Sequence, residues 1–221
     1  MTFSNGNDRS WLVEAYLWAT EQLYGPLAWA YDAVAWVVSF GYWQRWRLDA
    51  LTYIQPGTVL EVGFGTGELL LVMAKQGYRV TGLEPSAQMH KVTARKLRRR
   101  KEYVSRVRGN AEAIPLAAGS FANVIVTFPS NYILREATLG EIHRVLNANG
   151  CCVVVGWGVH FKSSLLRIVT QLWLGIGAKS AIDRFTQTAQ KAGFEVAHVM
   201  HHADAYTLPV VILEKHDDLY A

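Results

Sequence analysis

The stretch VLEVGFGTGELL, residues 59–70, joins an apolar run to three closely spaced glycines, Gly63, Gly65 and Gly67. The apolar run is typical of a buried strand, and the residues after the glycines are typical of a helix. Glycines let the backbone turn sharply and let a ligand approach closely, while free N–H groups at a helix start favour an anionic group. The stretch therefore predicts a ligand-binding turn between a strand and a helix.

The rest of the chain after Thr58 alternates short β-branched runs with helical segments, which is typical of a parallel sheet with crossover helices. We expect strands at residues 58–62, 79–83, 104–108, 122–128, 151–157, 195–201 and 208–214. We expect helices at 67–76, 86–101, 135–146 and 181–192, with a helical insertion at 162–176. No helix-length segment separates the last two strands, so they should pair antiparallel through a turn at 203–207. The fold class expected is α/β and Rossmann-like.

The composition bounds the class of protein. A chain of 221 residues with 51% hydrophobic residues can bury one sizeable core, which argues against disorder and for a single domain. The longest uncharged stretch, 113–134, is broken by Pro115, Gly119 and Pro129, so we expect no transmembrane helix.

The N-terminus MTFSNGNDRS lacks the features of a secretory signal, and the two cysteines, Cys151 and Cys152, lie together in an apolar run. Adjacent cysteines in such a run are typical of small buried core residues rather than of a redox or metal site. We therefore expect a cytoplasmic protein without a bound metal.

The spacing of the glycines narrows the kind of ligand. The dinucleotide pattern G-x-G-x-x-G requires glycine at position 68, which is Glu68 here, and this disfavours a dehydrogenase. An acidic residue, Glu61, precedes the glycines instead. Glu84 ends the next strand, where a carboxylate accepts hydrogen bonds from both hydroxyls of a ribose. Asn110 follows the third strand, where an adenine edge would lie.

Four segments in order, VLEVGFGTGELL, GLEPSAQM, GNAEAIPLAAGSFANVIVTF and EIHRVLNANG, resemble the successive motifs of class I S-adenosylmethionine-dependent methyltransferases. The resemblance covers roughly residues 58–157 and is closest to the ubiquinone and menaquinone biosynthesis methyltransferases and the bacterial phospholipid N-methyltransferases. It implies a seven-stranded, mostly parallel sheet in the order 3-2-1-4-5-7-6 with the last strand antiparallel. It also implies S-adenosylmethionine as cofactor and S-adenosylhomocysteine as product.

The same resemblance implies where the cofactor binds. The glycines and Glu61 would surround its methionine and ribose parts, Glu84 would hold the ribose hydroxyls, and Asn110 would face the adenine. The family usually has aspartate where this chain has Asn110, but an amide oxygen can still accept from the adenine amino group. The full set expected to bind the cofactor is Tyr31, Glu61, Gly63, Gly65, Gly67, Glu84, Pro85, Asn110, Ala111, Glu112, Thr127, Phe128 and Pro129.

Catalytic residues are less defined by the sequence. Methyl transfer from a sulfonium is an in-line displacement, so the protein mainly holds donor and acceptor together and excludes water, and a base is optional. The candidates are Tyr31, Tyr132 and His160, in no decisive arrangement. Tyr31 belongs to a Tyr-Asp pair that resembles one found ahead of the core in the same relatives, where the tyrosine lies near the cofactor.

The N-terminal segment 11–51 has helical periodicity with a break at Gly25-Pro26, which predicts two helices. Trp29, Trp36 and Trp43 are seven residues apart, which favours a stripe packed on the core. The further aromatics Trp11, Trp18, Tyr24, Tyr42 and Trp46 are too many to bury on one face, which favours an aromatic surface for a lipid-like acceptor. Arg45 and Arg47 among these aromatics suit a lipid-water interface.

Both faces of the expected sheet already have helices, so this segment predicts a lid over the ligand edge. The expected organisation is one domain, 1–221, with N-terminal helices at 1–55 and a core at 56–221 that holds the insertion at about 160–178. The aromatic lid indicates an apolar or amphiphilic acceptor, either a lipid headgroup amine or a quinone- or phenol-like ring, with peripheral membrane contact.

Two alternative functions stay open, a nucleic-acid methyltransferase and a cofactor-binding module without catalysis. The net charge is +4, and much of the excess lies in residues 91–108. A helix after the second strand ends at the edge opposite the ligand, so Arg98, Arg99, Arg100 and Lys101 should lie far from the site, which disfavours nucleic acid. The acceptor molecule, the acceptor atom and the oligomeric state stay open.

Overall fold

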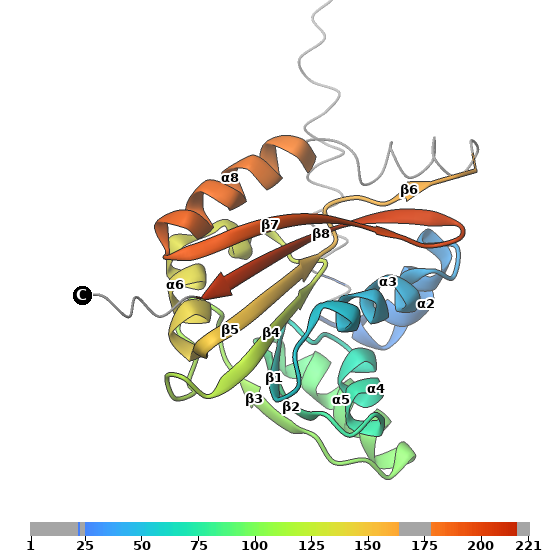
Figure 1. Cartoon of the computed structure of the whole chain (residues 1–221). Helices are drawn as coiled ribbons and strands as arrows, with labels where there is room; N and C mark the ends of the chain where they lie inside the picture. Colours follow the sequence, from blue (N-terminus) through green and yellow to red (C-terminus); the bar gives the residue numbers. More distant parts are fainter. Residues whose placement is uncertain (1–21, 23–24, 164–177, 216–221) are drawn as a thin grey trace, which may run out of the picture.

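A computed structural model describes residues 22, 25–163 and 178–215 of the chain (Figure 1). Within these residues eight strands form one sheet in the order β3-β2-β1-β4-β5-β8-β6, and β7 also pairs with β8. The strands are β1 (Thr58–Val62), β2 (Arg79–Glu84), β3 (Ser105–Arg108), β4 (Phe121–Thr127), β5 (Leu146–Val155), β6 (His160–Phe161), β7 (Phe194–His202) and β8 (Tyr206–Lys215).

The predicted strand order is confirmed once the two-residue strand β6 is set aside. Strands β1 to β5 pair in parallel, whereas β8 runs antiparallel to both β5 and β7. The last two strands join through a turn at residues 203–205, inside the range expected. Parallel strands bring their carboxyl ends to one edge of the sheet, which is where a ligand site forms in such folds.

Strand β6 was not expected. Val155 at the end of β5 pairs with Val210, and Phe161 in β6 pairs with Tyr206 on the same strand. After β5, which pairs with residues 210–214 of β8, the chain pairs with β8 a second time through β6, at residues 206–207. This second pairing lies beyond the carboxyl ends of the parallel strands.

Helices cover both faces of the sheet (Figure 1). One face carries α3 (Trp43–Asp49), α4 (Glu68–Lys75) and α5 (Ala87–Arg100), whose apolar residues share a core cluster with β1 and β5. The other face carries α6 (Glu136–Val145) and α8 (Ala178–Lys191), with Ile142 and Phe185 fully buried against β4 and β5. Each fully buried side chain of this size contributes roughly 1.5–3 kcal/mol of hydrophobic stabilisation.

The N-terminal segment differs from the single aromatic stripe that the spacing favoured. The chain forms η1 (Ala28–Ala30), α2 (Tyr31–Val38), α3 and η2 (Ala50–Tyr53), and Phe40 and Gly41 break the helix with positive φ angles of 53° and 80°. Trp29 and Trp36 are 73% and 64% exposed, so the interpretation as a stripe packed on the core is wrong for them.

The expectation that the whole N-terminal segment lies outside the core as a lid is also wrong. Trp46 is 1% exposed and Ala50 is 0% exposed, and both belong to the cluster that fills one face of the sheet. Arg47 is buried as well, at 6% exposure, which contradicts the expectation that it lies at a lipid-water interface. The helix α3 is therefore part of the core layer, and only α2 and η1 stand outside it.

The remaining expectations concern two predicted helical segments, the cysteines and membrane-spanning helices. The first N-terminal helix and most of the insertion at 162–176 lie outside the described residues. Cys151 and Cys152 are buried free thiols, at 2% and 0% exposure. In the part of the chain that the structure describes, no helix is both long enough and apolar enough to cross a membrane.

Candidate cofactor-binding site

The glycine-rich turn joins β1 to α4 and needs glycine for its backbone shape. Gly63, Gly65 and Gly67 have φ angles of 75°, 53° and 73°, in the left-handed region that side chains disfavour. A Cβ at Gly67 would lie 2.4 Å from Thr93 Cγ2, whereas a Cβ at Gly65 would meet no atom within 4 Å. The turn is thus packed against α5 on one side and open above Gly65 on the other.

Glu84 lies directly beside this turn, as the sequence predicted. Its carboxylate accepts hydrogen bonds from the N–H of Gly65 at 3.1 Å and from the N–H of Ser86 at 2.9 Å. The side chain is 2% exposed, and burial raises its pKa above the ordinary value. Each carboxylate oxygen keeps lone pairs for a further donor. Pro85, the next residue, is exposed at the strand end.

Glu61 points into the same region from β1. It is 1% exposed, and its Oε2 atom has no hydrogen-bond partner among the described residues. Burial raises the pKa of Glu61 to about 8, and the charge of Arg47 opposes that shift. A buried carboxyl oxygen without a partner is costly, so this atom is a group that a bound ligand can satisfy.

The loop after β3 holds the residues expected near the adenine. Ala111 is buried, and Asn110 is exposed with its Oδ1 accepting a hydrogen bond from the N–H of Glu112 at 3.2 Å. The Glu112 carboxylate pairs with Arg135 at the start of α6. The amide oxygen predicted to accept from adenine therefore already orders the loop, and one lone pair remains for a ligand.

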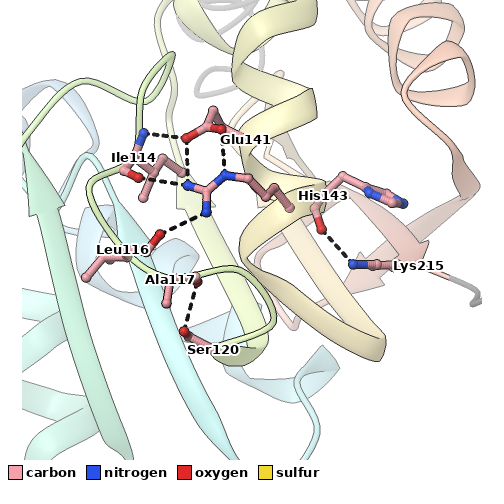
Figure 2. Close-up of polar contacts among 8 residues, drawn as sticks. Ile114, Leu116, Ala117, Ser120, Glu141, His143 and Lys215 are labelled. Atoms are coloured by element: carbon pink, nitrogen blue, oxygen red, sulfur yellow. Dashed lines mark hydrogen bonds and ion pairs between the residues drawn. The ribbon is translucent and has the colours of Figure 1, made fainter.

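Two residues that the sequence reasoning missed fix this loop from α6 (Figure 2). Glu141 accepts a hydrogen bond from the N–H of Ile114 at 2.6 Å, and Arg144 donates to the carbonyls of Ile114 and Leu116 at 2.8 and 2.9 Å. Glu141 and Arg144 also pair with each other, which lowers the pKa of the Glu141 carboxyl. Their spacing of three residues on a predicted helix was the available signal.

The residues after β4 lie beside the glycine-rich turn, because the register of Val62 with Val126 places Thr127 next to Gly63. Phe128 has a positive φ of 49°, which is rare for an aromatic residue and indicates local strain. Its ring stacks on Trp43 of α3 with centroids 4.1 Å apart. Thr127, Phe128 and Pro129 are all partly exposed, so each has a surface available to a ligand.

The three catalytic candidates occupy different places. The Tyr132 hydroxyl lies 3.0 Å from the point where a Cβ on Gly63 would stand, so the tyrosine faces the turn. Burial and the nearby charges of Glu84 and Glu61 raise the pKa of Tyr132, which keeps its hydroxyl protonated. Tyr31 packs edge-on against Trp43. His160 is exposed in β6 and pairs with Thr207.

A polar network ties α2 to the glycine-rich turn. Asp32 accepts a hydrogen bond from Thr66 at 2.6 Å and pairs with Lys96 of α5 at 2.8 Å. Lys96 also pairs with Glu68 at the start of α4, at 2.5 Å. The sequence singled out Tyr31 of the Tyr-Asp pair, whereas the structure shows that Asp32 makes the contact with the turn.

Comparison with known proteins agrees with this arrangement. Residues 60–154 match the family model described as a methyltransferase domain. The chain is 30% identical over 145 residues to a ubiquinone/menaquinone biosynthesis C-methyltransferase of Geotalea uraniireducens, covering 61% of each protein. It is 31% identical over 139 residues to a demethylmenaquinone methyltransferase of Thermus thermophilus, covering 60% of this chain and 63% of that one. The match thus spans about three fifths of the length of these relatives.

Solved structures share the fold. A putative S-adenosylmethionine-dependent methyltransferase of Methanococcus maripaludis superposes with a TM-score of 0.64 at 17% identity, covering 90% of this chain and 94% of that one. The glycine-rich turn and Glu84 at the end of β2 both lie inside the residues that match the methyltransferase domain. Residues 60–154 are therefore similar to a methyltransferase domain, and the chain has the fold of solved S-adenosylmethionine-dependent methyltransferases.

Proposed function

We propose that the protein transfers the methyl group of S-adenosylmethionine to a small apolar acceptor with a quinol- or phenol-like ring. The observation that carries the acceptor class is the stack of Trp43 on Phe128, 4.1 Å between centroids, beside the glycine-rich turn. Both rings are partly exposed and lie against the buried Trp46, which itself packs against Phe161. Aromatic walls bind flat apolar rings through area burial and offset stacking.

The residues present fit S-adenosylmethionine. The open space above Gly65 accommodates a ligand close to the backbone, and Glu84 next to it has lone pairs for ribose hydroxyls. The unpartnered Oε2 of Glu61 offers an acceptor for the cofactor's ammonium group. When bound, the cofactor would supply a methyl group activated by its sulfonium, and the protein would hold the two reactants in position.

The role of the chain in this proposal is to position the two reactants and to exclude water. Tyr132 faces the turn with a raised pKa, so it acts as a hydrogen-bond donor and does not take up a proton. A quinol-like acceptor suits a site without a strong base, because its own hydroxyl groups make the ring carbon nucleophilic. The carbon gains the methyl and then releases its proton to solvent.

The relatives support this class of acceptor, since their names specify methylation of ubiquinone or menaquinone precursors. A lipid headgroup amine is the other amphiphilic acceptor that the aromatic N-terminal segment favours. The discriminating experiment supplies methyl-labelled S-adenosylmethionine to the full chain with a demethylated polyprenyl naphthoquinol, a phospholipid mixture, or DNA and RNA. Label in the naphthoquinol is expected.

Label in another acceptor would identify a different class of substrate. Label in the phospholipid amine would replace the ring acceptor by the headgroup acceptor, and label in nucleic acid would overturn the small-molecule proposal. Binding of S-adenosylhomocysteine without methyl transfer to the naphthoquinol, the phospholipids or the nucleic acids would indicate a cofactor-binding module.

We further propose that α2 brings the enzyme to a lipid surface, because an acceptor with a polyprenyl chain resides there. The exposed apolar residues of η1, α2 and the turn after α2 include Trp29, Trp36, Val37 and Phe40, at 73%, 64%, 63% and 44% exposure. Tryptophan and other amphipathic side chains favour the membrane interface. Replacing Trp29 and Trp36 together by serine should abolish sedimentation with phospholipid vesicles. The matched control is Tyr103→Ser, which removes a 92% exposed aromatic residue beyond the end of α5.

A further inference from the structure

Arg47 is a buried cation with one polar atom that has no hydrogen-bond partner among the described residues. Its side chain lies in α3 at 6% exposure, and within the described residues its Nε atom is buried and makes no hydrogen bond. None of the ion pairs among those residues involves its guanidinium. Its guanidinium lies over the ring of Trp43, with 5.8 Å between the guanidinium carbon and the ring centroid. Burying a cation in this way costs free energy unless an anionic or hydrogen-bonding group pairs with it.

The charge of Arg47 acts on the carboxyl of Glu61. Arg47 is the strongest electrostatic influence on the Glu61 carboxyl, yet the two groups do not form a direct ion pair. Both are more than nine-tenths buried, and each has one unpartnered polar atom, Nε on Arg47 and Oε2 on Glu61. A buried basic group and a buried acidic group, each with an unpartnered polar atom, are suited to a ligand that carries both an acidic and a basic group.

The position of this pair suits the amino-acid end of the cofactor. Glu61 lies two residues before Gly63, at the point where β1 enters the glycine-rich turn. An α-amino acid group carries an ammonium and a carboxylate a few ångströms apart, matching an acidic and a basic partner. We infer that Arg47 binds the carboxylate of the methionine moiety of S-adenosylmethionine, while Glu61 accepts a hydrogen bond from its ammonium. The inference rests on the proposed function, because it uses the same cofactor.

The packing of α3 in the core layer is what directs Arg47 inward. Trp46 and Ala50, on the same helical segment, are fully buried and fix its position against the sheet. Helical spacing then directs Arg45 and Arg47 to different sides, so Arg45 is exposed while Arg47 points inward. The cation–π contact with Trp43 also connects cofactor binding to the Trp43–Phe128 stack proposed for the acceptor.

The test measures ligand affinity by titration calorimetry, without relying on turnover. The ligands are S-adenosylhomocysteine, decarboxylated S-adenosylmethionine, which lacks only the carboxylate, and 5′-methylthioadenosine, which lacks the whole amino-acid end. For Arg47→Met, we expect roughly 10- to 100-fold weaker binding of S-adenosylhomocysteine, the effect of one charge-assisted hydrogen-bonding partner. Binding of the two truncated ligands should stay within about twofold of the unaltered protein, an effect of negligible free energy.

Matched variants complete the experiment. Arg45→Met removes an exposed arginine from the same helix and should leave all three affinities unchanged, whereas Arg47→Lys should recover part of the loss. Equal losses for all three ligands in Arg47→Met would overturn the inference and make Arg47 a structural residue. If Arg47→Met does not fold, the unaltered protein provides the test. The inference requires it to bind S-adenosylhomocysteine much more tightly than the decarboxylated ligand, and equal affinities would overturn the inference. Failure to bind S-adenosylhomocysteine at all would instead overturn the proposed function.

Discussion

Asp32 of α2 accepts a hydrogen bond from the hydroxyl of Thr66 in the glycine-rich turn, with 2.6 Å between the two oxygens. The other carboxylate oxygen pairs with Lys96 of α5, which also pairs with Glu68 at the first residue of α4. The N-terminal helix is therefore connected to the backbone that the cofactor is proposed to contact. A ligand that orders the turn will also order α2, and the reverse holds by linkage.

Removal of this connection should weaken cofactor binding modestly. Thr66→Val keeps the shape of the side chain and removes the hydrogen bond, and Asp32→Asn removes the charge that pairs with Lys96. Because the Asp32 side chain is 39% exposed, each change should cost only about 1 kcal/mol, seen as a several-fold increase in the Kd for S-adenosylhomocysteine. Asp183→Asn, at an exposed position of α8, is the control and should have no effect.

Glu84→Ala should nearly abolish binding of S-adenosylhomocysteine. The proposed hydrogen bonds to two ribose hydroxyls are charge-assisted, each contributing roughly 1.5–3 kcal/mol, and the variant also releases the N–H of Gly65. Calorimetry on this variant and on Glu136→Ala, an exposed acid at the start of α6, separates the site from a general charge effect. An unchanged Kd for Glu84→Ala would remove this residue from the site.

The buried Glu61 should make stability depend on pH. Burial raises its pKa from 4.5 to about 8, so the folded state holds a proton that the unfolded chain releases between these values. Its contribution is full below pH 4.5, declines as the pH rises, and is lost above pH 8. Urea unfolding of Glu61→Gln should therefore show less loss of stability than the unaltered protein between pH 5 and about pH 9. Parallel pH profiles for the two proteins would contradict the raised pKa.

The basic end of α5 should be dispensable for cofactor binding and methyl transfer. Arg98, Arg99 and Arg100 are exposed in the last turn of α5, with the left-handed residue Lys101 after them. Replacing the three arginines by serine should leave the Kd for S-adenosylhomocysteine within about twofold, since no contact to the site is lost. Lys96→Met, one turn earlier, should weaken binding because it breaks the pairs with Asp32 and Glu68. A large loss of activity in the triple variant would revive the nucleic-acid alternative.

Most of the sheet could be predicted because its signals are local. β1 was predicted to the residue, and β2, β3, β4 and β7 within one residue at each end, since β-branched runs and turn residues mark these boundaries. β8 starts at Tyr206 instead of 208, and β5 differs most, because it starts at Leu146 instead of 151. Leu146 pairs with Phe121 across an irregular register, so a contact between distant segments extends this strand beyond its apolar run.

The N-terminal segment could not be predicted in the same way. Trp29, Trp36 and Trp43 share a seven-residue spacing, but Phe40 and Gly41 turn the chain so that Trp43 belongs to a different helix. Nothing in the spacing distinguishes an exposed Trp36 from a half-buried Trp43. The positive φ of Phe40 is rare for an aromatic residue and is maintained by the surrounding packing.

The sequence by itself determined the fold class, the glycine-rich turn and the acid at the end of β2, because each depends on neighbouring residues and their backbone conformations. Only the tertiary structure decided which charges are buried. Arg45 and Arg47 are two residues apart in an aromatic helix, and their chemistry is the same in the unfolded chain. Arg47 faces inward because α3 packs through Trp46 and Ala50 onto the sheet, and packing between distant segments selects the side of a helix that loses its water.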